Sequence, residues 1–176
     1  QLDAMKASNK KIVLLTQTFA SPTTELIIKK FIKKYPNIEH IIYDAVSDSK
    51  ALDAFEVSYG VRALPTYDFE KASVIVSLSA DFLGDWQGGG FSKGYAKNRV
   101  PKNGKMSKHY QIEANMSLSG ANADVRLPLK PSLQIKALLK IYENISGENT
   151  GVTLEDKLES NLKTISESLI AAGSSG

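Results

Sequence analysis

The chain contains no cysteine, and only two of its 176 residues are histidines, His40 and His109. The lack of cysteine excludes disulfide bonds, thiolate zinc sites and cysteine-held iron–sulfur clusters within this chain. Two histidines leave little material for a histidine-based metal site or a Ser-His-Asp triad. We therefore expect neither a metal site nor a catalytic residue here.

Long apolar runs and a strong net charge are also missing. No run approaches the roughly 18 residues that a membrane span needs, so we expect no membrane-crossing segment. The net charge of +3 is too small to indicate nucleic-acid binding by itself. Initiating methionine and signal peptide are absent, and both ends look cut. We interpret the chain as an excised piece of a longer protein, whose location it then does not reveal.

Apolar residues are arranged with the periodicities of strands and helices in alternation. The first strand, a helix opened by Ser21 and Pro22, and the second strand predict a βαβ unit. Together the patterns predict a three-layer α/β domain whose mostly parallel sheet has helices on both faces. The four predicted strands are Lys11–Leu15, Ile38–Tyr43, Val74–Leu78 and His109–Glu113.

The remaining chain divides around that domain. We expect residues 1–10 to be frayed, residues 11–147 to form the α/β domain, and residues 148–176 to form a linker and a terminal helix. Thr153 is the predicted cap of that helix, which carries one narrow apolar stripe and therefore needs a partner surface. The partner is either this domain or an absent part of the parent. Residues 82–108 are rich in glycine and lysine and predict a long irregular loop.

Val74–Leu78 is nearly all apolar, as a central strand covered on both faces would be. Ligands in open α/β sheets bind beyond the carboxyl ends of such strands. Asp81 and Glu113, each near a strand end, are thus the best site candidates, although both could be solvated loop carboxylates. His109, His40 and Trp86 are better explained as structural residues than as a base, a ligand or a stacking platform.

Three segments in order resemble the molybdopterin oxidoreductase family. Asp68-Phe-Glu-Lys-Ala-Ser-Val-Ile-Val-Ser-Leu-Ser-Ala-Asp81 is similar to its D-x-x-x-A-D-x-x-x-x-x-G-x-N segment, the exit loop for the pterin dinucleotide. Glu113-Ala-Asn-Met-Ser-Leu-Ser-Gly-Ala-Asn-Ala-Asp124 is similar to its D-P-R-x-T-x-T-x-x-x-A-D segment. Val125-Arg-Leu-Pro-Leu-Lys-Pro131 follows, like the family's h-x-h-P-h-x-P-G.

A closer resemblance is to the degenerate branch found in the large iron–sulfur subunit of bacterial alternative complex III, a quinol-oxidising respiratory complex. The stretches that carry it are residues 21–23, 40–47, 80–86, 106–113 and 117–124. This resemblance implies a domain without a pterin cofactor, in a parent with iron–sulfur clusters elsewhere. It also implies other subunits of a membrane-bound complex as partners and a position at the periplasmic face of the inner membrane.

Four residues depart from the active family's pattern. The family's Gly is Ser79, its Asn is Asp81, its Asp is Glu113 and its Arg is Asn115. Loss of an arginine removes charge-assisted hydrogen bonds to phosphate, and an added aspartate places a negative charge near it. The four positions are therefore expected to be vestiges of a dinucleotide site.

Three functions stay open from the sequence. The first is a non-catalytic scaffold of a respiratory electron-transfer oxidoreductase subunit. The second is the cofactor-binding domain of an active molybdopterin oxidoreductase, with molybdopterin dinucleotide held near Asp81 and Glu113. The third is an unrelated small-ligand domain of flavodoxin-like type.

Overall fold

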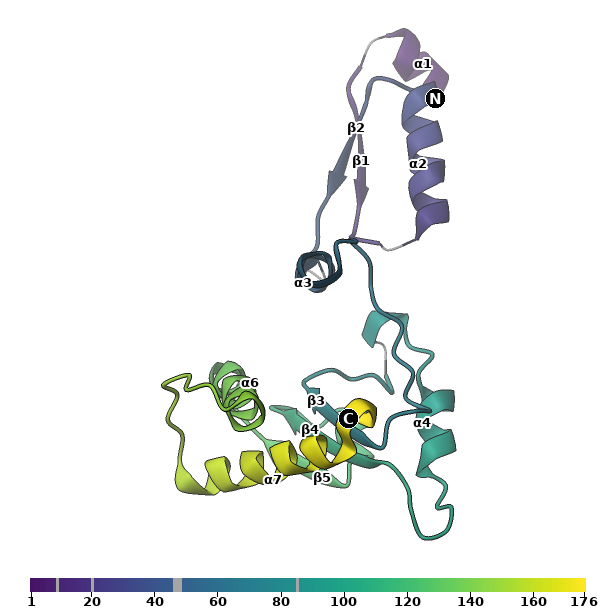
Figure 1. Ribbon diagram of the computed structural model, residues 1–176. Coiled ribbons are helices and arrows are strands. Elements are labelled where there is room, and N and C mark those ends of the chain that lie inside the picture. Colours follow the sequence, from purple (N-terminus) through teal and green to yellow (C-terminus); the bar gives the residue numbers. More distant parts are fainter. Residues whose placement is uncertain (9, 20, 46–48, 85) are drawn as a thin grey trace. The chain divides into compact units, whose positions relative to one another are not determined.

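The computed structural model describes residues 1–8, 10–19, 21–45, 49–84 and 86–176 (Figure 1). Within them the chain forms two compact units, Gln1–Thr66 and Tyr67–Gly176. The resemblance stretches 40–47 and 80–86 contain residues 46, 47 and 85, which lie outside the described residues. Each unit is an α/β structure with parallel strands only, so the predicted fold class is confirmed.

The N-terminal unit is the predicted βαβ unit. Its elements are α1 (Leu2–Ala7), β1 (Ile12–Thr16), α2 (Pro22–Lys34), β2 (Ile38–Ile42) and α3 (Ser49–Tyr59). Strands β1 and β2 pair in parallel, with Ile12 opposite Ile38. Helix α2 starts as predicted, because the Ser21 side chain accepts a hydrogen bond from Thr24 N and Pro22 occupies the first turn.

The expectation that residues 1–10 are frayed is wrong for most of that stretch. Residues Leu2–Ala7 form α1. Tyr35 Oη donates to Asp3 Oδ1 at 3.1 Å, and Lys6 Nζ donates to the carbonyl of Lys34 at 2.9 Å. These contacts with the end of α2 hold a helix that is too short to be stable alone.

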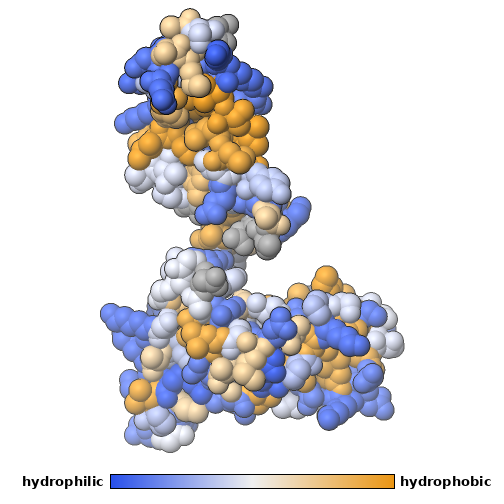
Figure 2. Space-filling model, turned by 180° about the vertical axis from the view of Figure 1, so that it is seen from behind, coloured by the Kyte–Doolittle hydropathy of each residue, from blue (hydrophilic) through white to orange (hydrophobic). Residues whose placement is uncertain are grey.

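One face of the N-terminal sheet is uncovered in the described residues. Burial alternates along β1, so that Val13 and Leu15 lie on the opposite face from Ile12 and Leu14. Val13 is 51% exposed and Leu15 is 63% exposed. Figure 2 shows hydrophobic surface on this unit. A sheet face of this composition normally packs against another layer.

The C-terminal unit contains a three-stranded parallel sheet in the order β3-β4-β5. Its strands are β3 (Val74–Leu78), β4 (Lys108–Glu113) and β5 (Val125–Pro128). The central strand is β4, and β3 is at an edge of this sheet, so the prediction of Val74–Leu78 as the central strand is wrong for the described sheet. The described strands also pair as two sheets rather than as the single sheet expected. Apolar periodicity identifies a strand, whereas its neighbours depend on tertiary packing.

Helices cover both faces of this second sheet (Figure 1). On one face α6 (Pro131–Ser146) and α7 (Asp156–Ala172) pack with Tyr110 and Ile112 in the larger core cluster. On the other face Ile75, Phe82 and Tyr95 form a second cluster, to which α4 (Ser92–Arg99) contributes. The short helix α5 (Leu118–Ala121) contacts β4 as well. The unit therefore has the expected three layers.

The apolar stripe of α7 finds its partner within this unit. Leu162 and Ile165 are almost fully buried in the larger core cluster, and Leu154, Leu158 and Leu169 pack against that cluster. The helix starts at Asp156 rather than after Thr153, and Glu159 Oε1 accepts a hydrogen bond from Leu154 N at its start. The backbone N–H of Ser73 donates to the carbonyl of Ser175 at 2.8 Å, which joins the chain end to the beginning of β3.

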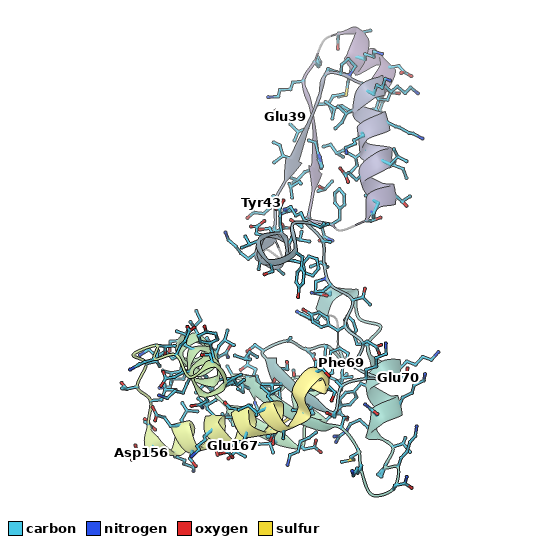
Figure 3. All side chains as sticks on the ribbon, viewed as in Figure 1. Glu39, Tyr43, Phe69, Glu70, Asp156 and Glu167 are labelled. Atoms are coloured by element: carbon cyan, nitrogen blue, oxygen red, sulfur yellow. The ribbon has the colours of Figure 1, made fainter. Side chains whose placement is uncertain are left out.

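Residues 82–108 contain more regular structure than predicted. They include the 3₁₀ turn η1 (Trp86–Gly88) and α4. Helix propensity in α4 is weak because of Gly94, but Tyr95 is buried in the second core cluster. Figure 3 shows Phe69 and Glu70 on the segment that leads into β3, near α4, and Lys97 Nζ donates to both carboxylate oxygens of Glu70. Tertiary contacts thus override a weak local signal.

None of the described helices is both long enough and apolar enough to cross a membrane.

Replacing Leu162 by alanine tests whether α7 belongs to the core of the C-terminal unit. This side chain has no exposed surface, so its truncation leaves a cavity and should lower the free energy of unfolding by about 2–5 kcal/mol. Urea unfolding followed by fluorescence of Trp86, the only tryptophan, reports on this unit. The neighbouring exposed Lys163→Ala variant should change stability by no more than about 0.5 kcal/mol. Equal effects of the two variants would contradict a buried α7.

Candidate functional site

Three of the four predicted site residues line one cavity at the carboxyl ends of β3 and β4. Ser79 follows β3, Glu113 ends β4, and Asn115 lies two residues further along. The cavity has a volume of about 430 Å³. Its other lining residues are Ala114, Ser117, Pro131 and Gln134. Asp81 is not among them.

Ser79 has a backbone conformation that favours glycine. Its φ is 56°, in the left-handed region that non-glycine residues rarely adopt. Ser79 N donates to the carbonyl of Ile112 at 2.8 Å, and its hydroxyl donates to Gln134 Oε1 at 2.8 Å. The turn at this position is therefore one that glycine adopts at lower cost than serine.

Glu113 is 2% exposed, and neighbouring donors occupy both of its carboxylate oxygens. Oε1 accepts from Arg126 Nε at 2.6 Å and from Ser117 N at 3.2 Å. Oε2 accepts from Ser117 Oγ at 2.7 Å and from Gln111 Nε2 at 3.2 Å. Burial raises the pKa of Glu113, but Arg126, Ser117 and Gln111 together bring that pKa below its usual value. The group is a carboxylate at neutral pH with its hydrogen-bonding capacity used internally.

Asp81 points to α5 and holds the loop after β3 against it. Its Oδ1 accepts from both the backbone N and the hydroxyl of Ser119, each at 2.8 Å. The same hydroxyl accepts from Leu83 N at 2.9 Å. Burial raises the pKa of Asp81, but the hydrogen bonds from Ser119, together with the backbone N–H groups of Leu118 and Gly84, bring that pKa below its usual value. Asp81 therefore connects two loops of the fold.

Two glycines make room for these two carboxylates. A Cβ atom on Gly120 would lie 1.9 Å from Glu113 Oε1, and one on Gly84 would lie 2.3 Å from Asp81 Oδ2. Neither distance is possible for real atoms. In the sequence Gly84 follows Asp81, and Gly120 follows Glu113, within a few residues. The reason for each glycine is clear only once the structure shows that it lies against the acid.

A row of buried polar side chains along β4 was not predicted from the sequence. His109, Gln111 and Glu113 alternate with Tyr110 and Ile112, and the first two are fully buried. Gln111 Nε2 donates to Glu113, so Gln111 Oε1 accepts from His109 Nε2 at 3.1 Å. The period-two pattern of polar residues in a strand could have indicated one polar face.

His109 completes this row as a neutral imidazole. Burial lowers its pKa, although the hydrogen bond to Gln111 raises it in part. Nε2 carries the proton of this neutral ring, and the unprotonated Nδ1 lies 3.2 Å from Tyr95 Oη. Tyr95 Oη donates its proton to the carbonyl of Asn122 at 3.0 Å. The geometry gives His109 no access to solvent, as its interpretation as a structural residue requires.

Arg99 and Asp124 close the other end of the row. Arg99 donates to both Asp124 oxygens, at 2.7 and 2.8 Å, and Asp124 Oδ2 also accepts from His109 N at 2.7 Å. The hydrogen bonds from Arg99 hold the pKa of Asp124 below its ordinary value. This ion pair is partly buried and connects α4 to Asp124, the residue before β5, which also bonds the backbone of β4 at His109.

The other residues considered from the sequence lie elsewhere. Trp86 packs against Tyr67 and Phe91, with ring centroids 5.3 and 5.8 Å apart, and so attaches its loop to the unit. His40 belongs to the N-terminal unit, where its Nε2 lies 2.9 Å from Thr16 Oγ1. In the described part of the chain no group of three or more His, Asp or Glu residues could hold a metal ion.

The cavity does not fit a pterin dinucleotide well. Its lining contains no lysine or arginine among the residues described, whereas phosphates need charge-assisted donors. Arg126 is adjacent, but its Nε is paired with Glu113. Asn115, an exposed amide, is the polar side chain of the lining left to a ligand, because Gln134 accepts from Ser79 Oγ and donates to the carbonyl of Leu129.

Gly120→Ala tests how closely the α5 turn packs on Glu113. The added methyl group overlaps the carboxylate, so the free energy of unfolding should fall by about 1–3 kcal/mol in urea unfolding followed by Trp86 fluorescence. Ala121→Ser, at the exposed neighbouring position, is the matched control and should leave stability within about 0.5 kcal/mol. If the Gly120→Ala variant were as stable as the wild type, the Glu113 carboxylate would not lie against the α5 turn.

Asp81→Asn tests the charge of Asp81 through the pH dependence of stability. The folded pKa lies below the ordinary 3.8, so the carboxylate stabilises the fold above pH 3.8 and the contribution is lost as pH falls through the folded value. The asparagine variant lacks this contribution at every pH. Its free energy of unfolding should therefore fall less steeply than that of the wild type below about pH 4. If the free energies of unfolding of the wild type and the variant fell in parallel with pH, the ionised carboxylate of Asp81 would not be stabilised by Ser119.

Comparison with known proteins gives this site no relative: no family model matches the chain, and no curated protein sequence matches it.

Proposed function

We propose that this chain is a non-catalytic scaffold and interaction domain of an electron-transfer oxidoreductase subunit, of the type found in quinol-oxidising alternative complex III. The observation that carries the proposal is the internal use of the site's acids. Glu113 is saturated by four donors and Asp81 is bonded to Ser119, so neither is free for a nucleotide. Iron–sulfur clusters would then lie in other parts of the parent protein.

An apolar stripe on α6 supports the interaction role. A neighbouring side of this helix is buried through Ala137 and Ile141 in the core. The exposed side chains recur at helical spacing, which is typical of a surface that packs on another protein. They are Ile135 at 72%, Leu138 at 51%, Tyr142 at 47% and Ile145 at 48% exposure.

The second candidate is the cofactor-binding domain of an active molybdopterin oxidoreductase. It is favoured by the left-handed Ser79 turn and by the start of α6 at the cavity, since both features suit a ligand near the strand ends. The two candidates differ in what the intact parent contains. A scaffold leaves the parent without molybdenum and pterin, whereas the second candidate requires both in stoichiometric amounts.

The test combines metal analysis with one interface variant. The purified parent complex should contain iron but no stoichiometric molybdenum or pterin, and Leu138→Glu should reduce recovery of the assembled complex at least tenfold without changing the stability of this chain. Lys163→Glu adds the same negative group to an exposed site on α7 and should leave assembly intact. Stoichiometric molybdenum would refute the scaffold, and normal assembly of the Leu138→Glu variant would refute the α6 interface.

A further inference from the structure

A second and larger cavity lies in the C-terminal unit, on the α6–α7 side of the sheet. Its volume is about 660 Å³, within the usual range for small-molecule sites. It is formed by the end of β5, the first half of α6 and the beginning of α7, which Asp156 marks in Figure 3. Its apolar lining is Leu127, Pro128, Leu129, Leu133, Leu154 and Leu158.

The walls of this cavity are held by hydrogen bonds. Thr150 donates through both N and Oγ1 to Glu143 Oε2, at 3.2 and 2.7 Å. These bonds, together with Lys140, lower the pKa of Glu143 to about 2. Lys140 Nζ donates to the carbonyl of Val152 at 3.2 Å. The connection between α6 and α7 is thereby fastened to α6, and the cavity does not depend on an unsupported loop.

The leucine lining continues the larger core cluster to the surface. Leu129 is 8% exposed and belongs to that cluster, and Leu127, Leu133, Leu154 and Leu158 pack against it while remaining partly exposed. Water in such a space contacts apolar walls, so a hydrocarbon that replaced it would bind favourably. Each further methylene group buried there should strengthen binding about fourfold.

Two lysines give the cavity a charged rim. Lys136 comes from α6 and Lys157 from α7, and neither forms an ion pair or hydrogen bond with another described residue. The rim also carries Glu155, Thr153 and Asn161, so its charged lining residues are two cations and one anion. A lysine stem can lie along apolar surface while its ammonium group stays at the edge.

We propose that this cavity binds a linear amphiphile with a carboxylate head, of the fatty-acid class. The hydrocarbon chain lies against the leucines, and the carboxylate lies between Lys136 and Lys157. A cation or a neutral head would lose the charge-assisted hydrogen bonds that the two free ammonium groups offer. The proposal is independent of the scaffold function, because the lining of this cavity shares no residue with the strand-end cavity or with the exposed stripe of α6.

The experiment is calorimetric titration of the whole chain with dodecanoate, decanoate and dodecanol, below their critical micelle concentrations. Dodecanoate should bind with one-to-one stoichiometry, more tightly than decanoate by up to about 16-fold. The Lys136→Gln/Lys157→Gln variant should weaken dodecanoate binding about tenfold or more and leave dodecanol binding unchanged. Lys163→Gln, on the exposed side of α7, is the matched control and should bind as the wild type does.

Several results would overturn the proposal. They are an absence of saturable dodecanoate binding, equal affinity for dodecanol and dodecanoate, or unchanged affinity in the double lysine variant. All these variants alter exposed residues, and thermal unfolding of each checks that the fold is intact. If dodecanoate did not bind and the amides around the cavity were protected from hydrogen exchange in the intact parent, the occupant of the cavity would be a protein segment instead.

Discussion

The C-terminal unit depends on one charged group, the buried carboxylate of Glu113 at the end of its central strand. A charge that has left water is costly unless nearby groups replace the lost hydration. Four hydrogen bonds from Arg126, Ser117 and Gln111 do so here. The turn that contains Ser117 must approach closely to make them, and that approach leaves no room for a side chain at Gly120. The position of α5 on the sheet is therefore a consequence of one buried carboxylate.

The same carboxylate determines the direction of the hydrogen bonds along β4. Because an ionised carboxylate only accepts, Gln111 must donate to it and present its own oxygen to His109. His109 then donates through Nε2, and its Nδ1 lies 3.2 Å from Tyr95 Oη of α4. The polar row thus connects the strand end to the layer formed by α4. A fully bonded polar network of this kind favours one arrangement of the core over others, since a shifted register would leave buried groups unpaired.

The sequence was informative where the signal is local. Parallel strands, the βαβ unit and the helix begun by Ser21 and Pro22 could be predicted from periodicity and capping, and so could an accumulation of polar groups after two strands. Helix α4 could not, because Gly94 weakens its propensity and a tertiary contact of Tyr95 stabilises it. Nor could the partners of Glu113, since Arg126 lies 13 residues away and meets it only when β4 and β5 pair. The order of the strands in the sheet could not be predicted either, because it also depends on contacts between distant segments.

At the strand ends a cavity lies beside carboxylates whose hydrogen bonds are made within the chain. A ligand site needs groups whose hydrogen bonds are left open, and a stable fold needs buried charges whose hydrogen bonds are closed. Around Glu113 and Asp81 the second requirement is met, because each carboxylate is bonded to groups of its own chain. Stability alone is then a sufficient reason for these acids and their glycines. This favours a structural role for the strand ends. Interaction with other molecules is then better sought at the exposed apolar side of α6 and at Lys136 and Lys157, which have no partner among the described residues.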